Sequence, residues 1–289
     1  MLDAKFAAFQ TLLRGYRSAI IAYSGGVDSV FLAHAAHQVL GDQSLAVIAD
    51  SPSLPRRELT EALALAEQFH FPVRVIQTTE FANEDYLKNP LNRCYFCKHE
   101  LFSELVPLAR ELNFTTILYG ENASDIGDFR PGAKAAEEFQ IRAPLKEAGL
   151  TKAEIRELSA RFGLPTSDKP QMACLSSRVP HGEAVTVNKL AQIEAAENIL
   201  RDLGFTDVRV RHHELPGPNA TPSERNDLTA APERAALARI EVGPSELPRL
   251  LDSALSARIA AELRRIGYLH VTLDLQGYRR GGANLLPPA

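Results

Sequence analysis

The chain has 289 residues, 45% of them hydrophobic and 24% charged, and its formal net charge is -4 at pH 7. This length allows roughly two ordinary domains, each with a core of its own. A slightly acidic chain lacks the broad basic field with which proteins hold tRNA or duplex DNA, so nucleic acid is not an expected partner. Small acidic substrates held by a few local arginines are compatible with this charge.

The apolar patterning and the cysteines indicate the compartment. No run approaches the roughly 18 apolar residues needed to cross a bilayer, and the start MLDAKFAAFQ lacks the basic flank, long apolar stretch and cleavage site of a signal peptide. The 3 cysteines are an odd number, which suits a reducing compartment better than a disulfide framework. We therefore expect a cytoplasmic protein without a membrane partner, whose thiols have a role other than disulfide bonding.

The first half of the chain alternates short apolar runs with helical patterns. The apolar runs predict buried parallel strands at 18–24, 45–50, 73–79 and 115–120. Helices are expected behind Pro55 and from about Cys97 to Asn113. This alternation predicts an α/β fold with a doubly wound parallel sheet. Because such sheets bind ligands beyond the carboxyl ends of their strands, a site is expected where these strands end.

The second half of the chain predicts a smaller α+β domain. A helix over about 152–162, which a capping box of Thr151 and Glu154 begins, is expected to end at Gly163. The segment that follows is rich in proline and serine and has no periodicity, which indicates a connection between domains. Later patterns predict helices at 188–203 and 245–265 and strands at 207–213, 237–242 and 268–275. The expected limits are 1–166 for the first domain, 167–187 for the connection and 188–289 for the second domain, with a flexible loop near 214–234.

A turn with the sequence SGGVDS follows the first expected strand and leads directly into a helix. Backbone N–H groups and the positive end of the helix dipole would converge on one spot there, which favours an anion. Gly25 and Gly26 allow the backbone to approach phosphate oxygens closely. Ser24 and Ser29 can add hydroxyl donors, and Asp28 can hold Mg²⁺ or its water shell. The alternative is an ordinary strand-to-helix turn in which Asp28 only caps the helix.

This hexapeptide resembles the SGGxDS loop of the PP-loop ATP pyrophosphatases, which split ATP into AMP and pyrophosphate while they adenylate a substrate. It lacks the lysine that a Walker loop carries after its last glycine. Further segments, which extend over most of the chain, are similar to those of one family within this superfamily, the LarE family. These segments are NRCYFCKHELF at 92–102, YGENASDIGDFRPG at 119–132, APLKEAGLTKAEIRELSARFGLP at 143–165 and DKPQMACLSSRVPHGEAVT at 168–186.

The resemblance implies a sulfurtransferase that helps to make the nickel-pincer nucleotide cofactor of lactate racemase. Such an enzyme uses ATP and Mg²⁺ to adenylate a carboxylate of a pyridinium dicarboxylate mononucleotide, and a sulfur then attacks and releases AMP. Two rounds complete the pincer. The resemblance also implies a homo-oligomer, a hexamer. The implied partners are the nickel-pincer pathway proteins and a source of sulfide, such as free sulfide or a cysteine desulfurase.

The cysteines bear on where the sulfur comes from. In one branch of the LarE family a single cysteine, which matches Cys174, gives up its own sulfur and becomes dehydroalanine. Cys94 and Cys97 form a C-x-x-C pair, and with Cys174 they match the three-cysteine branch, which resembles proteins that carry a 4Fe-4S cluster. Three protein ligands leave one iron open for an added sulfide, so we expect a catalytic enzyme rather than a sacrificial one. The alternatives are sacrifice of Cys174, a zinc site completed by His99 or His181, and unrelated thiols.

Other residues are expected to contact the nucleotide beyond the phosphate loop. Asn122 and Asp125 follow the fourth strand at its carboxyl end, where they can meet ribose, base or magnesium. Arg130 and Lys98 can neutralise pyrophosphate as it leaves. The alternatives are an ordinary turn for the first pair and surface charges for the second.

The second domain is expected to hold the phosphate of the mononucleotide. Alternation along DVRVRHH places Arg209 and Arg211 opposite the valines, which makes a two-arginine clamp, and the LarE family has an Arg-x-Arg pair there. Arg239 alternates likewise on the next strand. Glu197 falls on the apolar stripe of the preceding helix and is expected to pair with one of these arginines. The alternative is an ordinary solvated strand face. Further candidates for the same phosphate are Ser177 and Arg178.

Two rival functions share parts of this pattern. A tRNA thiolase of the PP-loop superfamily can also combine the loop with C-x-x-C and a cluster, but it needs an RNA surface that this acidic chain does not indicate. A nucleotide-binding regulatory protein could hold ATP without splitting it, with zinc closing the connection. Release of pyrophosphate in the presence of the mononucleotide distinguishes the three.

Overall fold

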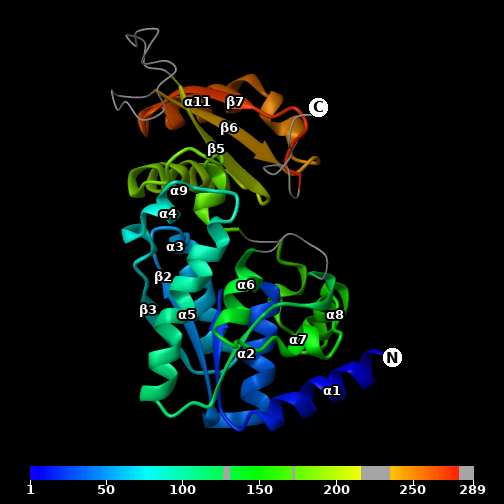
Figure 1. Ribbon diagram of the computed structural model, residues 1–289. Helices are drawn as coiled ribbons and strands as arrows, with labels where there is room; N and C mark the ends of the chain where they lie inside the picture. The colour runs from blue at the N-terminus through cyan, green and yellow to red at the C-terminus, as the bar shows by residue number, and fades with distance from the viewer. Residues whose placement is uncertain (126–130, 171–172, 216–234, 280–289) are drawn as a thin grey trace, which may run out of the picture. The chain divides into compact units, whose positions relative to one another are not determined.

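The computed structural model describes residues 1–125, 131–170, 173–215 and 235–279 (Figure 1). The chain divides into two compact units. The first unit comprises Met1–Tyr86 and Asn92–Met172, and the second comprises Leu87–Leu91 and Ala173–Ala289. The short piece Leu87–Leu91 therefore belongs with residues that follow it in the chain by more than eighty positions. The expected domain limits stay a prediction.

The first unit is an α/β layer structure, as predicted. Its strands are β1 (Ala19–Tyr23), β2 (Ser44–Asp50), β3 (Val73–Gln77) and β4 (Thr116–Tyr119). Over the described residues they form a parallel four-stranded sheet in the order β3-β2-β1-β4. Its helices are α1 (Leu2–Gly15), α2 (Val27–Leu40), α3 (Arg56–Gln68), α4 (Glu84–Leu87), α5 (Arg93–Glu111), α6 (Pro131–Glu138), α7 (Pro144–Glu147) and α8 (Lys152–Arg161).

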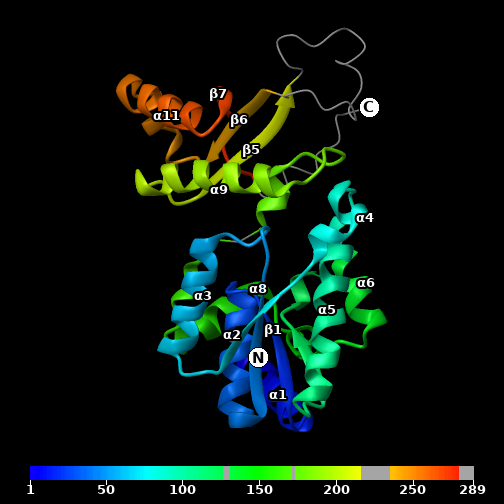
Figure 2. The same ribbon diagram turned by 90° about the vertical axis from the view of Figure 1, so that its left-hand side faces the viewer.

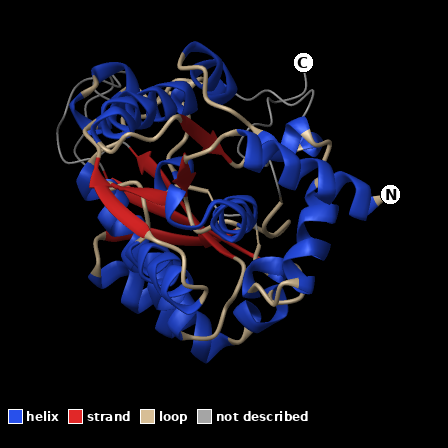
Figure 3. Ribbon diagram, turned by 90° about the horizontal axis from the view of Figure 1, so that it is seen from below, coloured by secondary structure: helices blue, strands red, loops and turns tan. Residues whose placement is uncertain are grey.

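Helices cover both faces of this sheet, because every residue of β1 is buried and successive side chains point to opposite faces. Ile21 and Tyr23 join the core under α1, α2, α3 and α8, whereas Ile20 and Ala22 join the core under α5 and α6. Figure 2 shows α2 and α3 on one side of β1 and α5 and α6 on the other, and Figure 3 shows strands with helices on both sides. The doubly wound prediction is confirmed.

Two details of the first unit differ from the sequence expectation. β3 is an edge strand of the described sheet, and its residues are partly buried or exposed, with Val75 39% exposed, so it is not the buried strand that was predicted. The helix α1 lies outside the predicted elements, although Phe9 and Leu13 are completely buried. Thr151 and Glu154 do form the predicted capping box of α8, and Gly163 follows the helix with φ +69°.

The second unit is the predicted smaller α+β domain. Its elements are α9 (Val187–Asp202), β5 (Val208–Leu215), β6 (Ala235–Val242), α11 (Ser253–Arg265) and β7 (Tyr268–Leu273). The described strands form a sheet in the order β5-β6-β7, in which β5 and β6 are antiparallel and β6 and β7 are parallel. Leu200 of α9 and Leu263 of α11 are buried in one core with Val208 and Val210 of β5.

The helix expected near 245–265 is divided into a 3-10 turn (Leu247–Leu251) and α11, because Asp252 caps α11 by accepting from the Leu255 N–H. From residue 216 to 234 the expected flexible loop lies outside the described residues, and so does the tail from 280. No helix among the described residues is long and apolar enough to cross a membrane.

Candidate active site

The turn between β1 and α2 is built on two glycines. Gly25 has φ +72°, a conformation that favours glycine, and a Cβ placed on it would lie 2.8 Å from the Cβ of Ala62 on α3. Gly26 is the N-cap of α2 and has no side chain above the helix end. The backbone N–H groups at the start of α2 therefore remain accessible to an anion, which the positive end of the helix also attracts.

The two serines of the turn hold its shape. The Ser24 N–H donates to Ser29 Oγ at 3.1 Å, and the two hydroxyl oxygens lie 3.0 Å apart. Ser29 Oγ in turn donates to the Gly26 carbonyl at 3.1 Å. Ser29 is buried and thus has a structural part in the turn, whereas Ser24 is exposed and can turn its hydroxyl group to a ligand.

Asp28 lies on the first turn of α2, and only one of its two carboxylate oxygens is used. Oδ2 accepts from Lys152 Nζ at 2.7 Å and from Asn122 Nδ2 at 3.4 Å. Oδ1 is buried and accepts no hydrogen bond from any residue that the structure describes. A buried carboxylate oxygen without a donor is costly unless a cation or a ligand supplies one. The environment of Oδ1 therefore fits the Mg²⁺ that a bound nucleotide would bring.

Lys152 is a site residue that the sequence interpretation missed. It is 124 residues from Asp28 in the chain and reaches it from the first turn of α8. Its position was a signal in itself, because a lysine at the N-terminus of a helix is disfavoured by the helix dipole unless another charge compensates for it. Its backbone N–H also donates to Ser124 Oγ at 3.0 Å, which fixes α8 to the segment after β4.

The segment after β4 places the predicted residues beside Asp28. Asn122 is 2% exposed and contacts Asp28, and its backbone N–H donates to Asp125 Oδ2 at 3.2 Å. Asp125 thus holds the segment after β4 in shape, and Asn122 faces the turn between β1 and α2. Arg130 lies outside the described residues.

A second buried carboxylate stands where β2 ends, and no sequence signal pointed to it. Ser51 and Ser53 directly follow β2, with their hydroxyl oxygens 2.8 Å apart. Ser53 Oγ donates to Glu80 Oε1 at 3.2 Å, while Glu80 Oε2 is buried without a partner among the described residues. Polar groups therefore stand at the carboxyl ends of β1, β2 and β4, where a parallel sheet binds ligands.

Two of the three cysteines share one turn of α5. Cys94 is exposed and Cys97 is partly buried, and neither forms a disulfide. Lys98 extends over the Phe102 ring at 5.7 Å from its centroid. Lys98 directly follows Cys97 and lies one helical turn from Cys94. Burial lowers the pKa of Lys98, whereas the thiols of Cys97 and Cys94 act in the opposite direction. The structure thus gives Lys98 a place beside the thiols.

The third cysteine belongs to the second unit. Cys174 is partly buried and forms the N-cap of a 3-10 turn (Leu175–Arg178). Within neither unit do the described residues contain a group of three or more His, Cys, Asp and Glu side chains placed to hold a metal ion. Cys94 and Cys97 lie in the first unit and Cys174 lies in the second. Cysteine thiolates are nevertheless the ligands that iron–sulfur clusters use.

The histidines considered as zinc ligands have other contacts. The His99 ring lies 4.9 Å from the Phe139 ring and within 3.5 Å of Ser103 Oγ. His181 Nδ1 lies 3.4 Å from the Asn89 carbonyl oxygen. Both rings have aromatic or backbone neighbours that account for their orientation.

Arg209 and Arg211 point to the same face of β5, as predicted, but the face is not solvated. They are only 5% and 7% exposed. Arg211 makes a two-pronged ion pair with Glu241 of β6, at 3.0 and 2.9 Å, and Arg209 stacks at 4.6 Å from the centroid of the Tyr278 ring. The alternative of an ordinary exposed strand face is therefore wrong.

Arg239 is the most accessible arginine of this group, with its side chain 38% exposed. It pairs with Glu241 at 3.3 Å and with Asp274 at 3.2 Å. Its Nε finds no acceptor within the described part of the chain. Arg239 can therefore accept an anionic ligand with less rearrangement than Arg211.

The partner of Glu197 differs from the expectation. Glu197 is 1% exposed and pairs with Arg178 through two hydrogen bonds of 2.8 and 3.0 Å, not with an arginine of β5 or β6. Burial disfavours the charge of Glu197, but Arg178 and then Arg209 hold the pKa of the carboxyl below its ordinary value. Helical periodicity identified a carboxylate that needed a partner, but it could not show that the connection would supply the arginine.

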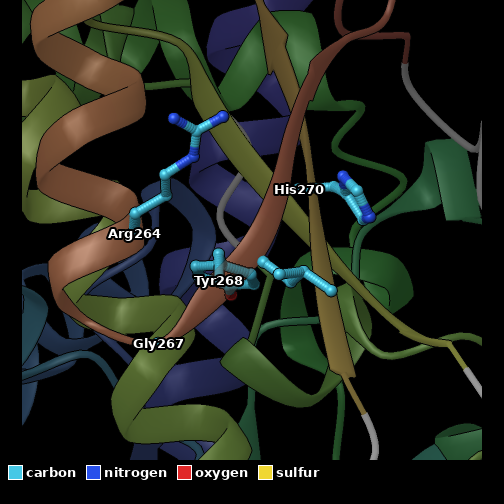
Figure 4. A pocket seen from close by; sticks show the side chains of 5 residues that line it. Arg264, Gly267, Tyr268 and His270 are labelled. Atoms are coloured by element: carbon cyan, nitrogen blue, oxygen red, sulfur yellow. The ribbon is translucent and has the colours of Figure 1, made fainter. Parts of the chain in front are cut away.

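A shallow hollow of about 550 Å³ lies elsewhere in the second unit, at the junction of α11 and β7 (Figure 4). Its lining residues are Arg264, Gly267, Tyr268, Leu269 and His270. None of the predicted nucleotide or phosphate ligands is among them, so this hollow is separate from the candidate site.

Comparison with known proteins agrees with this geometry. The NAD synthase family model matches residues 10–88, the part that contains the turn between β1 and α2. An uncharacterised protein of Synechocystis sp. is 41% identical over 284 residues, which cover 98% of each chain. The tRNA-specific 2-thiouridylase of Rickettsia rickettsii is 26% identical over 189 residues, which cover 52% of this chain and 51% of the thiouridylase.

A further relative covers nearly the whole chain. The pyridinium-3,5-bisthiocarboxylic acid mononucleotide synthase of Lactiplantibacillus plantarum is 33% identical over 285 residues, which are 98% of this chain and 95% of that protein. Similarity of this extent includes both units, whereas the similarity to the thiouridylase covers about half of the chain. The chain therefore belongs to the LarE family of PP-loop sulfurtransferases.

Proposed function

We propose that the protein uses ATP to convert the carboxylates of a pyridinium dicarboxylate mononucleotide into thiocarboxylates, a step in making the nickel-pincer nucleotide cofactor. The name of the Lactiplantibacillus plantarum relative supports the substrate class. The single observation that carries the ATP-dependent part is the turn between β1 and α2. It joins accessible backbone N–H groups to a carboxylate, Asp28, that has one buried oxygen unused among the described residues.

In the first step a carboxylate oxygen of the mononucleotide attacks the α-phosphorus of ATP. An O–P bond forms, and pyrophosphate leaves with the electron pair of the bond that breaks. The helix end at Gly26 would receive the negative charge of the phosphates, with Asp28 and Asn122 toward the metal and Lys152 toward the departing pyrophosphate. The acyl-adenylate that results has a carbonyl carbon that a sulfur nucleophile can attack.

In the second step sulfur replaces AMP on that carbonyl carbon. A C–S bond forms, and the C–O bond to AMP breaks with its electron pair. Cys94, Cys97 and Cys174 would hold a 4Fe-4S cluster, which would supply an exchangeable sulfide. If Cys174 gave its own sulfur instead, loss of its α-hydrogen and cleavage of its Cβ–S bond would leave dehydroalanine.

The second unit would hold the phosphate of the mononucleotide. Arg209, Arg211 and Arg239 stand on neighbouring positions of β5 and β6, since Arg211 is opposite Arg239 in the strand register. Arginines can bind phosphate with two parallel N–H groups each. Arg239, whose side chain is 38% exposed and whose buried Nε has no acceptor in the described structure, is the favoured first contact.

Pyrophosphate release tests the proposed function. Full-length protein is mixed with ATP, Mg²⁺ and the dicarboxylate mononucleotide, and pyrophosphate and thiocarboxylate are both measured. We expect release that depends on the mononucleotide. Release that requires tRNA instead would favour a thiolase, and ATP binding without release under either condition would favour a regulatory protein.

Metal analysis tests the source of sulfur. We expect anaerobically purified protein to contain iron and acid-labile sulfide, and expect Cys174 to keep its mass after turnover. Iron-free protein whose Cys174 has become dehydroalanine after the reaction would establish the sacrificial route. Zinc in stoichiometric amount would make the thiols structural.

A further inference from the structure

The 3-10 turn that follows Cys174 is held in place by Arg178, the last residue of the turn. Arg178 is only 2% exposed, and its side chain folds back over the turn. Arg178 Nη1 donates to the carbonyl oxygens of Ala173 at 2.6 Å and Cys174 at 3.0 Å. Ser177 adds two bonds to the Cys174 carbonyl, from its N–H at 3.0 Å and from its Oγ at 2.8 Å. The backbone on which the Cys174 side chain stands is therefore fixed from several directions.

A buried carboxylate keeps Arg178 in this position. Glu197 of α9 accepts from Arg178 Nε at 2.8 Å and from Nη2 at 3.0 Å. Glu197 Oε1 also accepts the Val210 N–H of β5 at 3.1 Å, which anchors the carboxylate to the sheet. Burial opposes the charge of the arginine, yet Glu197 raises the pKa of Arg178 above its ordinary value. The guanidinium is thus charged and fixed in orientation.

The same turn is tied to the strand that carries the predicted phosphate clamp. Arg211 Nη1 donates to the Ser177 carbonyl oxygen at 2.8 Å, while its Nε and Nη2 pair with Glu241. Every nitrogen of the Arg178 guanidinium already has an acceptor within the protein. An arginine in this state would have to give up existing bonds, in a site that is closed to solvent, before it could bind a substrate phosphate.

We propose that Arg178, held by Glu197, is a positioning residue that sets the place of Cys174 for sulfur transfer, and that it does not bind the substrate phosphate. This inference rests on the proposed function, in which Cys174 takes part in delivery of sulfur by either route. The geometric requirement is strict, because a displacement of about 1 Å at a reacting group can lower a rate about a hundredfold. Adenylation, which the first unit performs, does not need this alignment.

The variant Arg178→Lys tests the proposal. Lysine keeps the positive charge next to Glu197, but a single ammonium group cannot replace the planar fork that joins Glu197 to the carbonyls of Ala173 and Cys174. We expect mononucleotide-dependent pyrophosphate release within about twofold of wild type. Thiocarboxylate formed per pyrophosphate is expected to fall at least about tenfold. The KM for the mononucleotide is expected to stay unchanged, which a lost phosphate contact would not allow.

A second variant and a control keep the test valid if Arg178→Lys folds poorly. Arg178→Met combined with Glu197→Met removes both charges of the buried pair together, at the cost of the Val210 N–H acceptor, and is expected to show the same loss of thiocarboxylate per pyrophosphate. Arg201→Lys is the matched control, because Arg201 also reaches Glu197, at 3.5 Å, but lies on α9 and not in the turn. It is expected to behave as wild type in both measurements.

Hydrogen exchange of the metal-free protein gives a readout that is independent of activity. The Ser177 N–H is bonded to the Cys174 carbonyl, so its exchange should accelerate in both Arg178 variants and not in Arg201→Lys. A wild-type ratio of thiocarboxylate to pyrophosphate in the double variant would overturn the proposal, and so would an increased KM for the mononucleotide. If the wild-type protein released no pyrophosphate with the mononucleotide, the proposed function would fail, whereas unchanged exchange at Ser177 would refute the positioning role by itself.

Discussion

Asp28 in the first unit and Glu197 in the second are both carboxylates at predicted sites, and they differ in how fully their oxygens are used. Glu197 accepts two hydrogen bonds from Arg178 and one from the Val210 backbone. Asp28 accepts from Lys152 and Asn122 through one oxygen, and its other oxygen accepts nothing from the described residues. The comparison separates two kinds of charged group, one that has its partners already and one that still lacks a partner.

The same distinction applies to the arginines of the second unit. Arg178 and Arg211 donate through all of their nitrogens to protein acceptors, whereas Arg239 Nε has no acceptor in the described part of the chain. Residue type alone would treat the three as equivalent phosphate ligands. Their hydrogen bonds favour Arg239 as a ligand and Arg178 as a support for Cys174.

The largest effect is expected from Asp28→Asn, which keeps the shape of the side chain and removes its charge. Because an amide oxygen is a weaker ligand for Mg²⁺, mononucleotide-dependent pyrophosphate release should fall on the order of 1000-fold. Stability should change little, since Oδ1 has no donor to lose, the amide oxygen of asparagine can still accept from Lys152, and the Lys152 ion pair is partly exposed. Asp42→Asn is the control, because Asp42 is exposed beyond the other end of α2.

Glu197→Gln should lower stability strongly, whereas Asp28→Asn should change it little, so the pair of variants tests the comparison. It leaves Arg178 buried beside a neutral amide, which is expected to cost about 3 kcal/mol of unfolding free energy. Denaturant unfolding followed by hydrogen exchange within the second unit measures this loss. If Asp28→Asn destabilised the protein as much as Glu197→Gln does, the distinction between the two carboxylates would be refuted.

Acidification should weaken the second unit through His212. This histidine is 2% exposed, and burial, together with the charge of Lys189, lowers its pKa to about 4 from an ordinary 6.5. Between about pH 6.5 and pH 4 the imidazole of His212 therefore binds a proton in the unfolded chain but not in the folded unit. Stability is complete above about pH 6.5 and falls by about 3 kcal/mol as the pH drops toward 4.

His212→Asn removes this titration and can keep a polar contact with the Tyr268 hydroxyl, which lies 3.3 Å from His212 Nδ1. Hydrogen exchange at pH 7.5 and pH 5 measures the stability of each unit separately. His34, whose pKa burial also lowers, makes the first unit lose stability in the same direction, which the variant should leave unchanged. Equal acid sensitivity of the second unit in the variant and in wild type would contradict the assignment to His212.

Gly25→Ala tests whether the turn between β1 and α2 requires glycine at residue 25. The new methyl group would combine φ +72° with an approach of 2.8 Å to Ala62, so a loss of about 2 kcal/mol in unfolding free energy is expected. Gly163→Ala has nearly the same φ, +69°, but meets nothing within 4 Å, and should cost only about 1 kcal/mol. Addition of Ala62→Gly to Gly25→Ala should recover the difference; no recovery would mean that backbone strain accounts for the whole effect.

Sequence alone predicted the parts of the site that are contiguous in the chain. The SGGVDS turn, the capping box of Thr151 and the alternation of β5 all depend on local spacing, and the structure has each of them where it was expected. Alternation assigned Arg209 and Arg211 to one face correctly. It could not show that this face is buried, because the period of a strand does not reveal what covers it.

Contacts between distant segments were beyond the reach of local patterns. The pairing of Arg178 with Glu197 joins the connection between the domains to α9. The helical pattern indicated only that Glu197, on an apolar stripe, needed some partner. Glu80 meets Ser53 across 27 residues, with no motif at either end. Edge position likewise depends on the strand order of the whole sheet, which is why β3 was expected to be buried.

The smallest effect is expected from Lys152→Met, which removes the cation beside Asp28 and retains the length of the side chain. Lysine at this place would neutralise pyrophosphate as it leaves, so its loss should raise the KM for ATP about tenfold, or about 1.4 kcal/mol. Lys152→Arg should retain most of the affinity, because the charge remains. Lys5→Met is the matched control, since Lys5 meets the same helix through Glu154 at 2.8 Å and has a similar exposure, 30% against 23%. If Lys5→Met lowered the affinity for ATP as much as Lys152→Met does, the helix end, rather than the contact with Asp28, would account for the effect.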